Sequence, residues 1–470
     1  MHRKSVTITR MKSRVALLFI ATLAFGADDN RTLGERARQY LIDLIKINTS
    51  NPPGNETRVA EYLKQIADAN GIPCELLGGD PKRLNFVARL KGNGRQKPLL
   101  LMAHSDVVPA DRRQWNIDPF AGEIKDGFLY GRGAQDTKSL LAAEVAVLVE
   151  IKKRNIKLSR DIILLSESDE ESGSTGMQWL LQNAPAKIDA EFAINEGGHV
   201  ITLRDGQHVF QVQTAEKVPT RITLTAKGTA GHASLPRPDN PVLRLAMAIV
   251  KLCEAEQPVR VNATTRRYLK EMSKLDEYHW LVPLLPKLDN PATAMAAANQ
   301  IRTHDPEVDA MIRTTVTPTM LRAGMRINVI PNQAEGQVDV RRMPGESKED
   351  LLARFQKIIN DPSITIEPAP GQQMPSTDPS PLNSVLYKAV ERAIAKVNSG
   401  DLTVPYMTRG ATDGSFLRAR GTAVYGVPLF VYENNESRAH GNDERISLKA
   451  MDTGIELLWQ MVLEVASAGV

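Results

Sequence analysis

Five short segments of the chain place carboxylates and histidines where apolar stretches end. They are His104-Ser105-Asp106, Gln135-Asp136-Thr137, Glu167-Ser168-Asp169-Glu170-Glu171, Asn195-Glu196-Gly197 and Ala439-His440-Gly441. With one glutamate set aside as a general base, the segments supply two histidines and three further carboxylates. That set of ligands suits two borderline divalent ions that share one carboxylate, and such a site supports hydrolysis by an activated water.

Each segment taken alone also has a purely structural interpretation. His104 follows the apolar residues 99–103, and Asp106 could accept a hydrogen bond from its second ring nitrogen, as in a carboxylate–histidine–metal arrangement. A hydrogen-bonded histidine at a capped strand end would give the same pattern. Asp136 follows a glycine-containing turn that could push it into a site, but it could equally cap the helix expected at residues 139–154.

The acidic segment is the most informative of the five. Four acids within residues 167–171 would repel one another strongly unless a cation lay among them, although a solvated acidic turn is the usual explanation of such a run. The adjacent pair Glu170 and Glu171 allows one glutamate to bind metal while the other acts as general base.

The elements that must position these residues indicate an α/β catalytic domain. Short apolar strands alternate with amphipathic helices up to about Thr214, which favours a largely parallel, buried sheet with the ligands at the strand ends. The pattern then changes to an alternating strand, a long helical stretch at about 264–312 and strands at 325–330 and 335–341, which predicts an inserted α+β sandwich. The expected division is residues 27–213 and 344–470 for the catalytic domain and 214–343 for the inserted domain.

The N-terminus and the composition limit the class of protein. Basic residues precede the apolar run 15–25 and the small residues Gly26 and Ala27, which predicts a signal peptide at residues 1–26 and export, with a disordered tail or a retained anchor as alternatives. The net charge of +4 against 59 basic and 55 acidic residues gives no reason to expect a nucleic-acid partner or a membrane surface. No later segment reads as transmembrane. We expect Cys74 and Cys253 to be buried free thiols.

In combination, these motifs resemble the M20 family of metallopeptidases, which includes glutamate carboxypeptidases, aminoacylases, carnosinases and succinyl-diaminopimelate desuccinylases. The resemblance runs from about Arg36 to the C-terminus and includes the stretch from Trp115 to Gly131-Arg132-Gly133. It implies a zinc-exopeptidase-like catalytic domain, an inserted lid that forms a homodimer, and two zinc ions per subunit, for which cobalt or manganese could substitute.

The resemblance also implies a role for each matching residue. His104 and Glu196 would bind one ion, Glu171 and His440 the second, and Asp136 both. Glu170 would be the general base and Asp106 would orient His104, and the peptide bond after Asp136 is often cis in this family.

Further matches lie outside the ligand segments. His232 in Gly231-His232-Ala233-Ser234 would reach the active site of the partner subunit and stabilise the oxyanion, whereas on its own it reads as a loop histidine. Asn328 and Arg341 resemble lid residues that hold the substrate, and Gly410 resembles the start of a glycine-containing loop near it. The long helical stretch resembles the enlarged lids of carboxypeptidase-like and N-acyl-amino-acid-hydrolysing members.

The function expected is metal-dependent cleavage of the amide bond of small peptides, as a carboxypeptidase or dipeptidase. An N-acyl-amino-acid amidohydrolase of the aminoacylase or desuccinylase type is the alternative. A catalytically silent metal-binding protein, or one that stores metal or is structural, is a third possibility, but the silent form would be expected to have lost Glu170 or a ligand.

Overall fold

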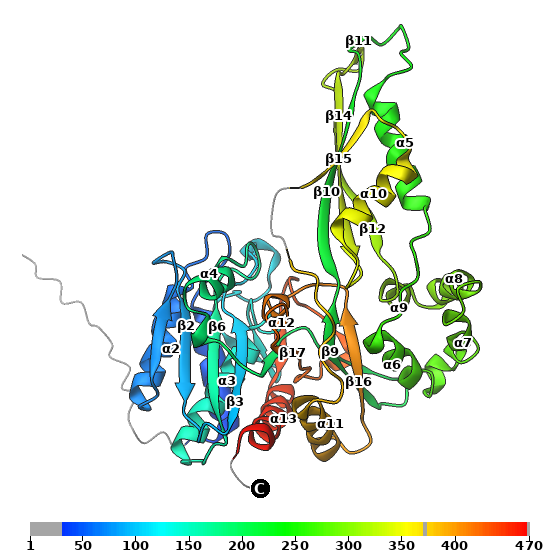
Figure 1. Ribbon diagram of the computed structural model, residues 1–470. Coiled ribbons are helices and arrows are strands. Elements are labelled where there is room, and N and C mark those ends of the chain that lie inside the picture. The colour runs from blue at the N-terminus through cyan, green and yellow to red at the C-terminus, as the bar shows by residue number, and fades with distance from the viewer. Residues whose placement is uncertain (1–30, 370–373, 468–470) are drawn as a thin grey trace, which may run out of the picture.

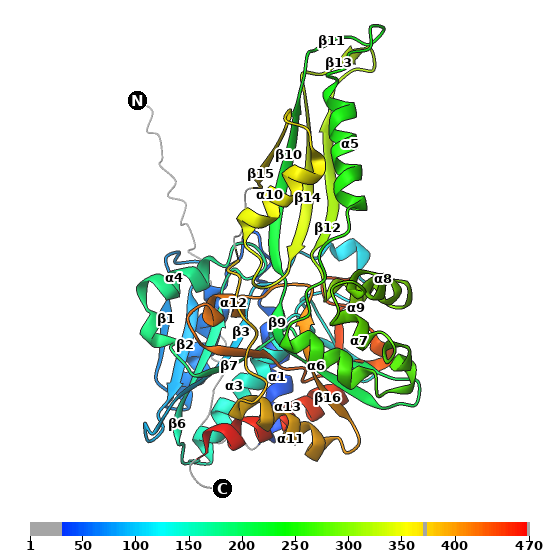
Figure 2. The same cartoon turned by 45° about the vertical axis from the view of Figure 1, so that its right-hand side comes forward.

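The computed structural model describes residues 31–369 and 374–467. The chain forms a body around a large sheet, from which a long arm rises (Figures 1 and 2). The expected signal peptide lies outside the described residues, so export stays a prediction.

In the described part of the chain, the body contains a nine-stranded mixed sheet. Its strands run in the order β1 (Cys74–Leu77), β2 (Asn85–Leu90), β6 (Arg160–Glu167), β3 (Gln96–His104), β7 (Phe192–Asn195), β17 (Ala423–Gly426), β9 (His208–Glu216) and β16 (Leu402–Thr408), with β8 (His199–Thr202) beside β9. The central strands β6, β3, β7 and β17 are parallel to one another. The predicted α/β class with a mostly parallel central sheet is confirmed.

The sheet is buried on both faces because its central strands are apolar at nearly every position. On β3, Leu99 and Leu101 join the core under one layer of helices, and Leu100 and Met102 join the core under the other. The first layer consists of α1 (Leu33–Lys46), α2 (Thr57–Ala69), α3 (Lys138–Lys153), α11 (Val385–Val397) and α13 (Leu448–Ala466). The second contains α4 (Thr175–Asn183) and the short α12 (Gly414–Arg418). Continuous apolar strands of this kind are typical of parallel sheets covered by helices on both sides.

The arm is built on a separate antiparallel sheet. Its strands run in the order β12 (Thr315–Ala323), β14 (Gln333–Arg342), β10 (Val218–Lys227) and β15 (Ile364–Pro368). Buried residues alternate along β10 and β14, and this apolar face packs against α5 (Pro241–Glu254) and α10 (Lys348–Ile359). Short strands β11 (Gly231–His232) and β13 (Val329–Ile330) pair at the tip (Figure 2).

The long helical stretch lies on the body and not on the arm. It consists of α6 (Ala263–Met272), α7 (Leu285–Leu288), α8 (Ala294–His304) and α9 (Pro306–Ala310). Tyr268 and Leu269 of α6 pack with Val404 and Tyr406 of β16 in one apolar cluster. The inserted sheet also continues past residue 343, because β15 pairs with β10. Helix α6 therefore packs on the body although it lies inside the expected inserted range 214–343. The inserted sheet, in turn, includes a strand that lies beyond residue 343.

The strands expected in the arm also differ in part from those observed. The expected strand at 325–330 is reduced to the short β13, whereas β12, for which we expected no strand, forms the edge of the arm's sheet. The expected strand at 335–341 corresponds to β14.

The cysteines correct one expectation. Both are free, as predicted, but Cys253 is exposed and Cys74 is half-buried. Cys253 lies in the last turn of α5, on the side that does not pack against the arm's sheet. Among the described residues, no helix is both long and apolar enough to cross a membrane.

Candidate metal centre

Three adjacent parallel strands deliver the acidic and histidine segments to one edge of the large sheet. His104 ends β3 and lies opposite Glu167, which ends β6, while β7 ends at Asn195 on the other side of β3. The loops that follow carry Asp106, the run 169–171 and Glu196. Crevices at the carboxyl ends of parallel strands are the usual position of binding sites in α/β sheets.

Asp136 is held in place by a buried glutamate from the other end of the sequence. Glu444 accepts hydrogen bonds from the backbone N–H groups of Gly133 (3.0 Å), Gln135 (2.6 Å) and Asp136 (3.0 Å). Its charge is balanced by Arg132, at 2.7 Å. The Asp136–Thr137 peptide bond is cis, as the family resemblance implied.

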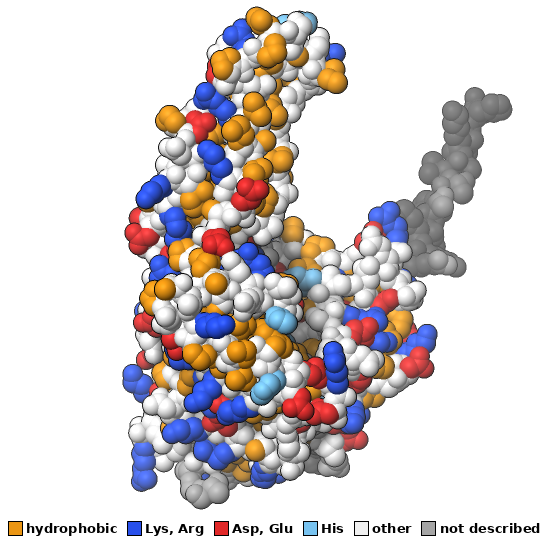
Figure 3. Space-filling view, turned by 90° about the vertical axis from the view of Figure 1, so that its right-hand side faces the viewer, with side chains coloured by type: hydrophobic (Ala, Val, Ile, Leu, Met, Phe, Trp, Pro, Cys, Tyr) orange, Lys and Arg blue, Asp and Glu red, His pale blue; other side chains and the backbone are white. Residues whose placement is uncertain are grey.

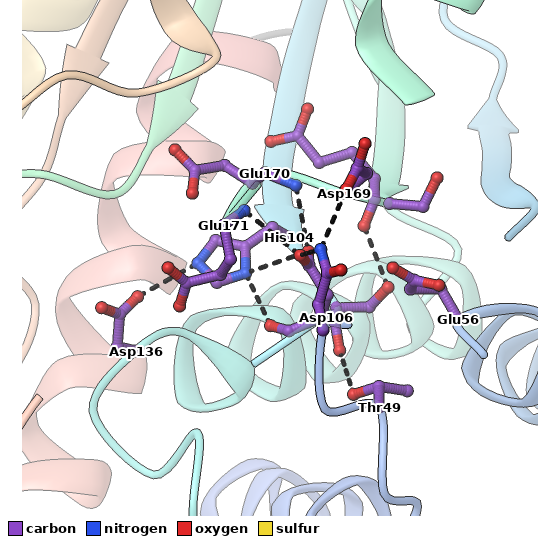
Figure 4. A network of polar contacts seen from close by, with 12 residues as sticks. Thr49, Glu56, His104, Asp106, Asp136, Asp169, Glu170 and Glu171 are labelled. Atoms are coloured by element: carbon purple, nitrogen blue, oxygen red, sulfur yellow. Dashed lines mark hydrogen bonds and ion pairs between the residues drawn. The ribbon is translucent and has the colours of Figure 1, made fainter. Parts of the chain in front are cut away.

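The Asp136 carboxylate lies between the two histidines (Figure 4 shows it beside His104). Its Oδ1 is 3.0 Å from His104 Nε2, and its Oδ2 is 3.0 Å from His440 Nε2. A different glutamate lies beside each histidine. Glu171 Oε1 is 3.1 Å from His440 Nε2, and Glu196 Oε1 is 3.9 Å from His104 Nε2. One shared carboxylate with a histidine and a glutamate on either side is the arrangement expected of a bridged pair of ions.

The ligand atoms are close enough together to hold metal. The ligand atoms of His104, Asp136 and Glu171 lie within 4.8 Å of one another, and so do those of His104, Glu170 and Glu196. The first group joins Glu171 to His104, whereas the shortest contact of Glu171 is with His440. Glu171 can belong to both descriptions, because a carboxylate beside the shared Asp136 is close to both histidines.

The electrostatics of the cluster also fit bound cations. Burial, and then the charges of Asp136 and Glu171, raise the pKa of Glu196 to about 8. Burial and the charge of Glu196 raise the pKa of Glu170 well above its ordinary value. Hydrogen bonds to Asp136 and Glu171 raise the pKa of His440 to about 10. The carboxylates therefore repel one another, and positive charge on the imidazoles offsets part of this repulsion, so divalent cations would satisfy the same donors.

Asp106 lies beneath this cluster and is fully buried. Its Oδ1 accepts a hydrogen bond from the backbone N–H of Glu170 (3.1 Å), and its Oδ2 accepts bonds from the N–H of Glu171 (3.2 Å) and from Asn51 Nδ2 (2.7 Å). His104 Nδ1 is 2.9 Å from the Asp106 backbone carbonyl and 3.6 Å from its carboxylate. Asp106 therefore contacts both the histidine and the loop that carries Glu170 and Glu171 (Figure 4).

Three of the candidate residues lie on the arm and outside the cluster, and Gly410 lies in the loop that leads to Asp413. His232 and Asn328 are exposed at the tip of the arm, where the Ala233 N–H donates to the Asn328 carbonyl at 3.0 Å and His232 contacts Ser234. Arg341 is on β14 and pairs with Asp339 at 2.7 Å. Gly410 is exposed in the loop after β16. The structure thus brings together seven residues, namely the five candidate metal ligands, Glu170 and Asp106. It leaves the predicted catalytic residue His232 and the predicted substrate-binding residues Asn328 and Arg341 outside this cluster.

Two supporting residues were missed from the sequence. Glu444 received no role, although it follows His440 closely and Arg132 stands in the Gly-Arg-Gly motif. Asp413 is buried, and Ser174 Oγ donates to it in a short contact across from the acidic segment. Burial raises the pKa of Asp413 to about 7. Asp413 lies in the glycine-containing loop that starts at Gly410, and the family resemblance of that loop was the signal that could have identified it.

Comparisons with known proteins give a consistent result. Residues 100–464 match the model of peptidase family M20/M25/M40. The chain is 28% identical over 456 residues to the human N-fatty-acyl-amino acid synthase/hydrolase PM20D1, covering 92% of this chain and 88% of that protein. It is 30% identical over 426 residues to a probable succinyl-diaminopimelate desuccinylase of Staphylococcus aureus (strain MRSA252), covering 88% of this chain and 94% of the relative. Among solved structures, the M20 family metallo-carboxypeptidase Sso-CP2 from Sulfolobus solfataricus superposes with a TM-score of 0.70 at 21% identity, covering 91% of this chain and 98% of that one.

Proposed function

The chain belongs to peptidase family M20/M25/M40 and is a metallohydrolase of that family, and we propose that it uses two zinc ions to cleave amide bonds in small peptides or N-acyl amino acids. The observation that carries this proposal is the Asp136 carboxylate, with one oxygen on His104 and the other on His440. A silent binding protein is less well supported, because Glu170 and all five candidate ligands are present.

The ligands divide into two sets around Asp136. His104 and Glu196 would hold one ion and His440 and Glu171 the other. When bound, the ions would supply Lewis-acid polarisation and would lower the pKa of water.

Glu170 is placed to act as the general base. It would take a proton from the attacking water and return it to the leaving nitrogen, as the C–N bond breaks and a carboxylic acid and a free amine form. Its backbone is fixed by Asp106, and its side chain is within reach of His104 and Glu196.

Two substrate classes remain as candidates. Exopeptidase action on dipeptides or on peptide C-termini is supported by the fold shared with a carboxypeptidase and with human carnosine dipeptidase 1 (TM-score 0.61 at 16% identity). Hydrolysis of N-acyl amino acids is supported by the human relative named N-fatty-acyl-amino acid synthase/hydrolase PM20D1, whose match covers 92% of this chain.

We also propose that the arm forms a homodimer and carries His232 to the partner's site. Apolar side chains are exposed on the outer side of α5, on β12 and at the tip, namely Leu243, Met247, Val250, Leu321, Met325 and Ile327. Figure 3 shows apolar side chains along the arm, above a recess between the arm and the body. A monomer with such a face would be unusual, and its own His232 lies at the far end of the arm (Figure 1).

The metal requirement is tested first. Amide cleavage should disappear after treatment with a chelator and return on addition of zinc, and Glu170→Gln should keep its zinc while losing turnover. Turnover by the metal-free protein or by Glu170→Gln would refute the proposal.

The dimer is tested by complementation. Inactive Glu170→Gln and weakly active His232→Ala should regain activity when they are mixed and allowed to exchange subunits, since each mixed dimer contains one site with both residues intact. Strictly additive activities would rule out the role in trans. Export is tested separately, by sequencing the N-terminus of the protein recovered from outside the cytoplasm, which should start after Gly26.

A further inference from the structure

A buried group of polar side chains lies beneath the loop that carries the candidate general base. Asn51, from the segment after α1, is at its centre and is only 5% exposed. The Asn51 side-chain nitrogen donates one hydrogen bond to Asp106 Oδ2 (2.7 Å) and one to Asp169 Oδ1 (2.9 Å). Because an amide nitrogen carries two N–H donors, both are used on carboxylates. One neutral side chain therefore holds Asp106 and Asp169 together (Figure 4).

Arg83 is the second residue that holds Asp169. Its Nη2 atom lies 2.9 Å from Asp169 Oδ1 and 2.5 Å from Oε1 of the fully buried Glu56. Its Nε atom donates to Glu56 Oε2 at 3.0 Å, so Glu56 holds the guanidinium group through both carboxylate oxygens. The backbone carbonyl of Arg83 also accepts a hydrogen bond from the Ser168 hydroxyl at 2.9 Å. Arg83 is thereby fixed in place and contacts two successive residues of the loop.

Asp169 has a backbone conformation that few residues other than glycine adopt. Its φ angle is +68°, in the left-handed region, which aspartate and asparagine enter more readily than other side chains do. Its Oδ2 accepts hydrogen bonds from the Thr175 hydroxyl (2.5 Å) and N–H (3.2 Å), and its carbonyl accepts one from the Ser174 N–H (2.6 Å). Because Glu170 is the next residue, the conformation of Asp169 sets the direction in which the Glu170 side chain leaves the backbone.

This support reaches Glu170 through the backbone and not through the metal ligands. Asp169 is held by Asn51, Arg83 and Thr175, and none of these three is a candidate ligand. Asp106 is different, because it also accepts a hydrogen bond from the backbone of the candidate ligand Glu171. Loosening Asp169 should therefore disturb the general base more than the metal centre.

We propose that Asn51, Arg83 and Asp169 are positioning residues for Glu170, which fix the direction of its carboxylate for proton transfer. This assignment rests on the proposed hydrolase function and adds residues to its site. A general base contributes about 10²- to 10⁴-fold to the rate, and a misplacement of about 1 Å can cost about 10²-fold. The loss of this support should thus appear in kcat, while zinc binding and KM change little.

Asp169→Asn is the first test, because asparagine keeps the shape of the side chain and tolerates the left-handed backbone. One carboxylate oxygen becomes an NH₂ donor, so the new side chain faces a donor either at Thr175 or at Asn51 and Arg83. On the dipeptide or N-acyl amino acid that the wild type cleaves, we expect kcat to fall about 10- to 100-fold and KM to stay within about threefold. Zinc content should equal that of the wild type. An unchanged kcat, or a loss that follows the zinc content, would overturn the assignment.

A second variant and a control show whether the residues act as one unit. Asn51→Ala removes both hydrogen bonds to the carboxylates, and it should lower kcat in the same way. In the double variant with Asp169→Asn, kcat should match that of the slower single variant, because the second change removes support that is already lost. Losses that multiply would contradict the assignment.

Asn262→Ala is the matched control for an effect of stability alone. Asn262 is half-buried and caps α6, where its side chain accepts a hydrogen bond from the Thr265 N–H at 2.9 Å. The variant should be less stable than the wild type because it loses this cap, but it should keep the wild-type kcat. If kcat fell in this control as it does in Asp169→Asn, destabilisation alone would explain the effect and the assignment would fail.

Crystal structures of the zinc-loaded wild type and Asp169→Asn give a readout that does not depend on turnover. We expect the Glu170 carboxylate to be displaced or disordered in the variant, while His104, Asp136 and Glu196 keep their positions. If Glu170 is displaced but the wild type cleaves no amide, the proposed function fails and the positioning role stands. If Glu170 keeps its position, the assignment fails whether or not the protein turns over substrate.

Discussion

Replacing Asp106 by asparagine tests how the buried carboxylate under the metal centre supports it. The change keeps the shape of the side chain but removes its charge and turns one acceptor into an NH₂ donor. In the native structure Oδ1 accepts from the Glu170 N–H, and Oδ2 accepts from the Glu171 N–H and from Asn51. Whichever way the amide is oriented, at least one backbone N–H faces another donor.

The magnitude follows from these contacts. A buried N–H left unpaired costs about 1–3 kcal/mol, and the surviving hydrogen bonds lose the extra strength of a charged acceptor. The free energy of unfolding of the metal-free protein should therefore fall by at least about 1–3 kcal/mol. Because the same loop carries Glu170 and Glu171, metal affinity or kcat/KM should also fall by about 10- to 100-fold, the usual range for residues that support metal ligands.

Three measurements check this prediction. Urea unfolding of the chelated protein gives the stability, competition with a chromophoric chelator gives the zinc affinity, and amide hydrolysis gives kcat/KM. Asp111→Asn is the control, because the carboxylate of the half-buried Asp111 pairs with its neighbour Arg113. If Asp106→Asn matches that control within about 0.5 kcal/mol and binds zinc as the wild type does, the reasoning is wrong.

Two further substitutions test the framework. Burial at the junction of β9 and β10 lowers the pKa of Lys217 from 10.5 to about 7. Between pH 7 and 10.5 the lysine is therefore neutral in the folded protein and protonated in the unfolded chain. Because the unfolded chain binds more protons, the free energy of unfolding should rise with pH over this range. Lys217→Met should reduce that slope by about 1.4 kcal/mol per pH unit around pH 8–9 in urea titrations, and an unchanged slope would show that the lysine is charged when buried. Gly131→Ala would bring a methyl group too close to the Ile45 side chain of α1, so thermal unfolding should show a loss of about 1–3 kcal/mol; full stability would mean that the Ile45 side chain or α1 moves to make room.

Local patterns predicted the strand ends that form the centre. Residues 99–103 and 162–165 are apolar, and each run is followed by polar groups, so β3 and β6 could be expected to end where His104 and the acidic segment begin. The sequence could not show that β6, β3 and β7 are neighbours in the sheet, because this depends on pairings between distant segments. The assignment of separate segments to one site therefore came from the family resemblance.

The less successful expectations share this dependence on distant contacts. The helical period of residues 264–312 correctly indicates helices, but only the apolar side chains of β16 determine that α6 packs on the body. β12 was missed because it lies at the edge of the arm's sheet, where most of its residues are exposed and the alternation of apolar and polar residues is weak. Cys253 was expected to be buried because α5 is apolar, yet α5 is apolar on its exposed side as well.

The candidate metal centre contains more carboxylates than positively charged side chains, and the surrounding fold holds these carboxylates close together. Burial raises the pKa values of Glu167, Glu170 and Glu196, and the protons of His104 and His440 offset part of the remaining negative charge. Divalent cations held by the same residues would replace these protons and supply the positive charge that the carboxylates need. Strands that are buried on both faces hold the acids together against their mutual repulsion. Asp106 fixes the loop that carries Glu170 and Glu171, and Glu444 fixes the loop that carries Asp136. Both do so by accepting hydrogen bonds from backbone N–H groups, which do not titrate. These backbone hydrogen bonds therefore hold the two loops that carry Asp136, Glu170 and Glu171 in place around the centre.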